Sequence, residues 1–76
     1  RTVTGEEVDL VIETEGKVLP IEIKSTSRPR IRDAANLLAF QNEYGKDTRA
    51  GLLLHNGAAI EWLTPKVLAV PWWKVI

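Results

Sequence analysis

The chain has 76 residues, with ten basic side chains, ten acidic ones and no cysteine. This length suits one small domain, and we expect residues 1–76 to form a single domain cut from a longer protein. The lack of cysteine excludes disulfides and thiolate metal sites, and zero net charge argues against an autonomous nucleic-acid-binding domain. No apolar run approaches the ~18 residues of a membrane span. We therefore expect a cytoplasmic protein with no membrane partner.

Two alternating segments predict a hairpin at the start of the chain. Residues 7–13 (EVDLVIE) and 18–24 (VLPIEIK) each place apolar side chains at every second position, and Glu15-Gly16-Lys17 between them is typical of a turn. With a two-residue loop at Glu15-Gly16, Leu10 faces Ile21 and the apolar faces coincide. A three-residue loop would bring apolar residues opposite polar ones, because a slip of one residue exchanges the faces of a strand. The pattern places Val8, Leu10 and Ile12 on one face.

The next segments predict one helix and two further strands. Apolar residues at helical spacing indicate a helix over residues 30–44, ended by Gly45. Residues 50–55 (AGLLLH) are typical of a strand buried on both faces, where Gly51 indicates a close approach of another group. Asn56-Gly57 favours a hairpin that returns through residues 59–63. We expect irregular structure or a turn of helix over residues 66–76.

The resulting order is strand, strand, helix, strand, strand. A right-handed crossover through the helix makes the third strand parallel to the second. The sequence therefore predicts an α/β (α+β) domain with a mixed sheet of ββαββ order.

The polar face of the hairpin carries the residues most suited to chemistry. In the favoured register Asp9 lies opposite Glu22, and Lys24 and Glu7 share that face. Opposed carboxylates repel one another unless a cation lies between them, and Mg²⁺ takes oxygen ligands while keeping several waters. A lysine beside them can position water and offset charge in a phosphoryl transition state. The alternative is a solvated sheet surface, although the expected helix would cover it, and charged groups on a covered face require a partner.

The segment EVDLVIE, a short turn and then residues 20–25 (PIEIKS) resemble the core signature of the PD-(D/E)XK restriction-endonuclease-like superfamily. More narrowly, the chain resembles the uncharacterised domain of that type found C-terminal to ATPase domains in bacterial and archaeal AAA+-like proteins. The resemblance includes the Tyr44-Gly45 helix end and the closing Pro71-Trp72-Trp73. It implies a nuclease-like core that lacks its first helix here.

The resemblance also implies roles for individual residues. Asp9 and Glu22 match the metal-binding acids, helped by the carbonyl of Ile23, and Lys24 matches the catalytic lysine. Three more residues take supporting positions, although Gln-x-x-Tyr is a loose match to the helical motif of some of these nucleases. These are Glu7, Gln41 and Tyr44. The implied cofactor is Mg²⁺, and ATP would bind only to an upstream domain.

Arginines and aromatic residues offer further candidates. Arg28, Arg30 and Arg32 crowd the start of the helix, where cations are unfavourable, so they form either a phosphate-contacting patch or a solvated face. We expect Trp62 to be in the core and His55 to be structural. Trp72 and Trp73 either close the core or anchor a partner.

Two functions remain open at this point. The first is a magnesium-dependent phosphodiesterase domain of an AAA+-type ATP-binding protein, acting on nucleic acid, with DNA as a possible partner. The second is a catalytically silent interaction or regulatory domain that docks on its own ATPase domain or on a partner protein. Divalent-metal binding at Asp9 and Glu22 would favour the first function, and exposed Trp72 and Trp73 without such binding would favour the second.

Overall fold

The first hairpin has the register that its apolar pattern predicts. The computed structural model describes residues 8–75, and it pairs β1 (Leu10–Thr14) with β2 (Lys17–Ile23) in antiparallel fashion. Leu10 lies opposite Ile21 and Thr14 opposite Lys17, so the predicted two-residue loop is confirmed. Glu15 and Gly16 have φ values of 52° and 79°, the left-handed conformations of a tight turn whose twist matches that of the strands.

The start of the hairpin differs from the prediction. β1 begins at Leu10, with Val8 and Asp9 preceding it. Val8 is buried in the core on the helix side of the sheet, whereas Leu10 and Ile12 are 53% and 41% exposed on the opposite face. The expectation that Val8 shares a face with Leu10 and Ile12 was wrong, because a bend at Asp9 interrupts the strand and its alternation.

A helix connects the hairpin to the centre of the sheet. The 3₁₀ turn η1 (Ile31–Ala34) leads into α1 (Ala35–Tyr44), where Gly45 ends the helix with a φ of 62°. A second 3₁₀ turn, η2 (Gly45–Asp47), leads to β3 (Gly51–His55), which runs parallel to β2 as predicted. A Cβ at Gly51 would lie 3.3 Å from Gln41 Nε2 and 3.4 Å from Leu37 Cδ2, which confirms the predicted close approach.

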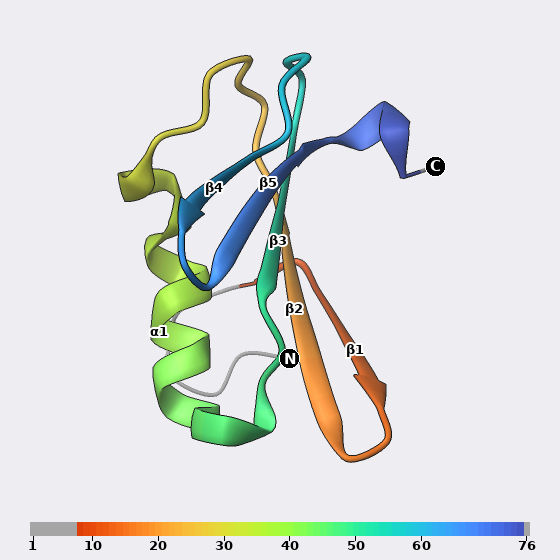
Figure 1. Cartoon of the computed structure of the whole chain (residues 1–76), viewed down its shortest axis with the longest axis vertical. Helices are drawn as coiled ribbons and strands as arrows, with labels where there is room; N and C mark the ends of the chain where they lie inside the picture. The colour runs from red at the N-terminus through yellow and green to blue at the C-terminus, as the bar shows by residue number, and fades with distance from the viewer. Residues whose placement is uncertain (1–7, 76) are drawn as a thin grey trace.

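The second half of the sheet is arranged differently from the prediction. β4 (Glu61–Thr64) does not pair with β3, because β5 (Val67–Pro71) lies between them, and the strand order is β1-β2-β3-β5-β4 (Figure 1). β5 is parallel to β3 and antiparallel to β4. The expected Asn56-Gly57 hairpin was therefore wrong. For the tail, expected to be irregular or a turn of helix, Val67–Pro71 is a strand instead and only Trp72–Lys74 forms such a turn. The interior position beside β3 requires a strand that is buried on both faces. Residues 67–70 meet this requirement better than Glu61 and Trp62, which are exposed.

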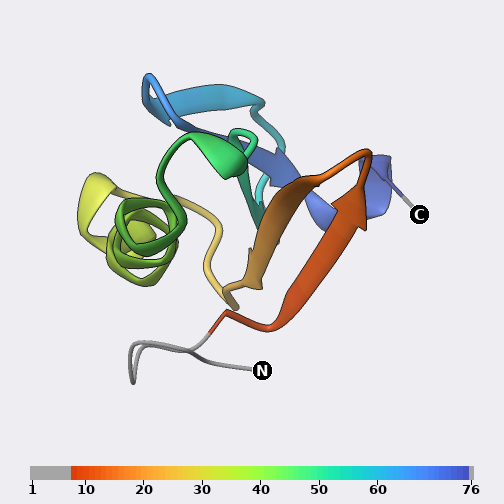
Figure 2. The same cartoon turned by 90° about the horizontal axis from the view of Figure 1, so that it is seen from below.

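The sheet has one covered face and one open face. Figure 2 shows α1 against one side, where Leu37, Phe40, Leu53 and Val67 are at most 2% exposed. On the other side Ile21, Leu54 and Val70 form a smaller cluster, beside more exposed apolar residues. Trp62 is opposite Leu68 of that cluster and is 57% exposed, so its expected place in the core was wrong. The class is that of an α+β domain with a five-stranded mixed sheet and one α-helix.

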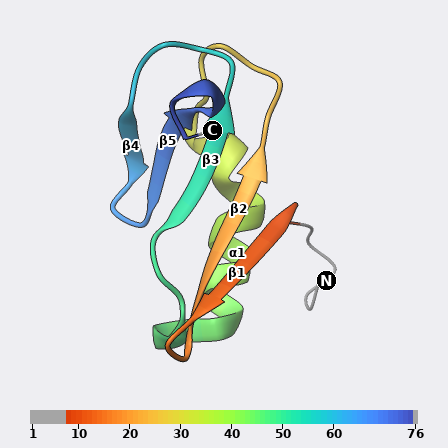
Figure 3. The ribbon, with the colours of Figure 1, turned by 90° about the vertical axis from the view of Figure 1, so that its right-hand side faces the viewer.

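The C-terminal residues of the described chain form a short 3₁₀ turn, η3 (Trp72–Lys74), which follows β5 directly (Figure 3). Trp72 and Trp73 are 44% and 49% exposed, so neither is part of the core of the described residues. Across residues 8–75, no helix is long and apolar enough to cross a membrane.

Candidate metal centre

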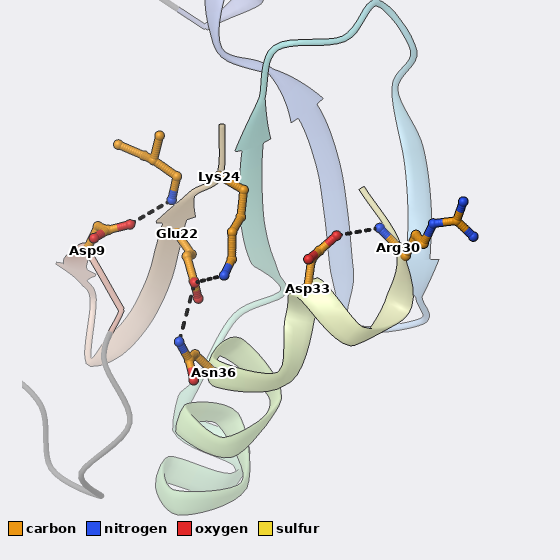
Figure 4. A network of polar contacts seen from close by, with 7 residues as sticks. Asp9, Glu22, Lys24, Arg30, Asp33 and Asn36 are labelled. Atoms are coloured by element: carbon orange, nitrogen blue, oxygen red, sulfur yellow. Dashed lines mark hydrogen bonds and ion pairs between the residues drawn. The ribbon is translucent and has the colours of Figure 1, made fainter. Parts of the chain in front are cut away.

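Glu22 and Lys24 meet on the face of β2 that α1 covers. The alternation of β2 sends the side chain of Glu22 toward the start of the helix, where it is only 5% exposed. Lys24 Nζ lies 3.3 Å from Glu22 Oε2, and Asn36 Nδ2 donates to the same oxygen at 3.3 Å (Figure 4). Oε2 therefore has two polar neighbours: Lys24, which directly follows β2, and Asn36 of α1.

The other carboxylate oxygen of Glu22, Oε1, has no hydrogen-bond partner among the described residues. Oε1 is also buried. A buried carboxylate oxygen without a partner is costly, and oxygen atoms of this kind are the ligands that Mg²⁺ and Ca²⁺ prefer. Glu22 is thus the residue of this domain whose environment most clearly fits a bound cation.

Asp9, which lies in the bend just before β1, approaches the same end of β2. Its Oδ2 accepts a hydrogen bond of 2.7 Å from the amide of Ile23, the residue between Glu22 and Lys24. The antiparallel ladder starts at Leu10 and Ile21, so Asp9 and Glu22 are not the ladder pair that the sequence predicted. Asp9 binds the backbone of β2 through its side chain, and its carboxylate is held one residue away from Glu22.

These groups fit a magnesium ion with several water ligands. Within the described residues, no three acidic or histidine side chains gather in a metal-binding cluster. Two carboxylates and the Ile23 carbonyl make a small set of oxygen ligands, and Mg²⁺ is commonly held by one or two carboxylates together with water. Lys24 is on the same side as Glu22, where its ammonium group could orient one of those waters.

Two of the three predicted supporting residues, Gln41 and Tyr44, lie away from this site. Gln41 is 5% exposed, and its Nε2 donates to the carbonyls of Arg49 and Lys66, next to the first residues of β3 and β5. Tyr44 stacks on Phe40 with ring centroids 4.4 Å apart. Both lie toward the end of α1 opposite to Asn36, which contacts Glu22. Glu7 lies outside the described residues.

The three arginines precede the helix and do not contact the site. Arg28, Arg30 and Arg32 are exposed in the segment between β2 and α1, and within residues 8–75 none of them forms an ion pair. The amide of Arg30 donates to Asp33 Oδ2 at 2.8 Å, and Figure 4 shows the guanidinium of Arg30 pointing away from Glu22. None of the three arginines is therefore part of the carboxylate site.

Asn36 and His55 make further polar contacts beside the sheet. Asn36 contacts Glu22, and the sequence analysis did not predict this contact. Its position one residue before the buried Leu37 indicates a place on the helix near the core. His55 is 1% exposed and has the structural role expected of it. Its Nδ1 accepts from the Gly57 amide at 2.9 Å, so the ring proton is on Nε2, which donates to the Ala59 carbonyl at 3.1 Å.

The fold and the site define the class of this protein: an α+β domain that holds two carboxylates and a lysine near the end of one strand of a mixed sheet. A family model described as a domain of unknown function, DUF4143, matches residues 1–75, and the chain belongs to this family. No curated protein and no solved structure matches the chain.

Proposed function

We propose that this domain is a magnesium-dependent phosphodiesterase of the PD-(D/E)XK type, which acts on nucleic acid as part of an AAA+-type ATP-binding protein. The observation that carries the proposal is the buried, unpartnered Oε1 of Glu22, beside Lys24 and close to Asp9. The sequence resemblance supports the same residues independently.

Each residue has a distinct task in the proposed reaction. Asp9, Glu22 and the carbonyl of Ile23 would hold Mg²⁺, which would supply Lewis-acid stabilisation of the charge on the phosphate. Lys24 would orient the attacking water and stabilise the developing negative charge on the phosphate oxygens. Asn36 holds Glu22 Oε2 and so leaves Oε1 for the ion. The patch of Arg28, Arg30 and Arg32 would contact flanking phosphates of the nucleic acid.

The test is a nuclease assay on the intact protein with Mg²⁺ or Mn²⁺, using single- and double-stranded DNA and RNA. We expect cleavage that falls at least about a hundredfold in Asp9→Asn, Glu22→Gln and Lys24→Ala, as is common when a group that stabilises the transition state is removed. Glu13→Gln, which changes an exposed carboxylate of β1, is the matched control and should retain activity. Equal cleavage by all four variants and the wild type would refute the catalytic assignment.

A second candidate function is supported by the exposed tryptophans. Trp72 and Trp73 are about half exposed next to one another in η3, and tryptophan is enriched at the centres of protein interfaces. In this alternative the domain is catalytically silent and docks on its ATPase domain or on a partner protein. Cleavage-deficient protein that shows no metal-dependent NMR shifts at Asp9, Glu22 and Ile23, yet binds its ATPase domain through Trp72 and Trp73, would favour this function.

A further inference from the structure

A hollow lies where β3 and β5 begin, whereas Glu22 lies beside Leu53 in the middle of β3. It has a volume of about 530 Å³ and lies between the end of α1, the segment that follows it and the turn before β5. In Figure 1 this is the end of the sheet where β3 and β5 begin, whereas β2 ends at the other. The hollow is therefore separate from the candidate metal centre.

The wall of the hollow is strongly basic. Lys46, Arg49 and Lys66 all line it, and none of its lining residues is acidic. Arg49 lies 3.8 Å from Glu15 Oε1, but the Glu15 side chain is 88% exposed, so that contact is open to water and weak. Within residues 8–75, Lys46 and Lys66 form no ion pair. In a chain of zero net charge, three cations around one concave surface produce a local positive potential that favours an anion.

The wall also contains a buried acceptor without a donor. Gln41 lines the hollow, and its Nε2 donates to the carbonyls of Arg49 at 3.2 Å and Lys66 at 2.9 Å. Because both neighbours are acceptors, the amide cannot be turned over, and its oxygen must point elsewhere. That oxygen, Oε1, is buried and has no hydrogen-bond donor among the described residues. The Gln41 amide is thus held in one orientation in the wall by the carbonyls of Arg49 and Lys66.

We propose that this hollow binds a small phosphate monoester, such as a nucleoside monophosphate. A phosphate monoester carries about −1.5 to −2 charges at neutral pH and three acceptor oxygens, which suits three cations better than a carboxylate does. The guanidinium of Arg49 can bind two phosphate oxygens together, while Lys46 and Lys66 act as point charges. The volume lies within the range of roughly 300–1,000 Å³ that is common for small-molecule sites.

The experiment is an NMR titration of the intact, ¹⁵N-labelled protein with adenosine 5′-monophosphate, inorganic phosphate and adenosine. We expect saturable shifts with the monophosphate at the amides of residues 45–50 and at the side-chain amide of Gln41. Inorganic phosphate should bind the same residues more weakly, because it has no organic part to contact the wall, and adenosine should cause no saturable shift. Arg49→Gln and Lys66→Gln should each weaken the monophosphate about tenfold, the effect of losing one charge-assisted hydrogen bond.

Two control variants make the result decisive. Lys74→Gln removes a lysine that lies over Trp73, outside the hollow, and should leave the affinity unchanged. Asp9→Asn, which should disable the metal centre, should also leave it unchanged, so a failure of the proposed function is distinguishable from a failure of this site. Non-saturable shifts, equal weakening by Lys74→Gln, or shifts centred on Asp9 and Lys24 would overturn the site. Inorganic phosphate binding as tightly as the monophosphate would overturn the contribution of the organic part.

Discussion

The two faces of β2 differ in what they bury and in how completely they bury it. Toward α1, the strand places the charged Glu22 at 5% exposure beside a core whose residues are almost fully covered. Away from α1, Ile21 is buried but Ile23 is 58% exposed, and Leu10 and Ile12 on the neighbouring strand are similarly open. The buried charge of β2, Glu22, is thus on the well-covered face, and the surplus of apolar surface is on the open one. Burial of Glu22 is costly unless a partner offsets it, and the proposed cation would be such a partner.

The comparison predicts its largest effect in the covered core. Leu53→Ala removes a side chain with 0% exposure between α1 and the sheet, and we expect a loss of about 2–5 kcal/mol in the free energy of unfolding. Such a loss approaches the whole stability of a domain of this size. Urea unfolding followed by circular dichroism would measure it. A loss below about 1 kcal/mol would show that the helix face is not the main core.

The second prediction tests whether the buried carboxylate of Glu22 binds a cation. Mg²⁺ at a hundred times its Kd should raise the free energy of unfolding by about 2.7 kcal/mol, because an ion that binds only the folded state stabilises it. Glu22→Gln should abolish this increase, and Glu13→Gln should retain it. Thermal unfolding with and without Mg²⁺ measures both. An undiminished metal effect in Glu22→Gln would place the ion elsewhere.

A smaller effect is expected at the contact between the helix and Glu22. Asn36→Ala removes the hydrogen bond of 3.3 Å to Glu22 Oε2, and we expect a loss of about 1 kcal/mol in the free energy of unfolding. The same variant should weaken Mg²⁺ binding, since the carboxylate is then less well oriented. Asn42→Ala, at an exposed position of the same helix, is the matched control. A metal affinity equal to that of the wild type would show that Asn36 does not orient Glu22.

The smallest effect is expected on the open face. Ile23→Thr keeps a β-branched side chain at a residue that is more than half exposed, so the free energy of unfolding should change by no more than about 0.5 kcal/mol. Unfolding in urea would measure this change, and a loss above about 1 kcal/mol would show that the open face is covered in solution. The contrast with Leu53→Ala is the sharpest test of the difference between the two faces.

Sequence reasoning succeeded where a single local rule had only one consistent solution. The alternation of the first two strands and the Glu15-Gly16 turn admit one register, and the helical spacing up to Gly45 predicted the end of α1. The same reasoning singled out Glu22 and Lys24, which the structure brings together. It missed Asn36, because the contact of a helix residue with a strand depends on how the helix is seated, and this is not encoded in the spacing of either element.

The sequence by itself therefore determined the hairpin, the helix, the parallel crossover and the polar face of β2, because each follows from a periodicity or a turn within a short segment. Only the tertiary structure decided that β5 lies beside β3 and that Val8 turns to the helix side. It also decided that Gln41 lies in the wall of the basic hollow and away from the carboxylates. These outcomes depend on competition between distant segments for the same buried positions. A strand that is buried on both faces takes the interior position beside β3, and a half-exposed strand takes the edge. The pattern within either segment does not predict which of the two will lie inside.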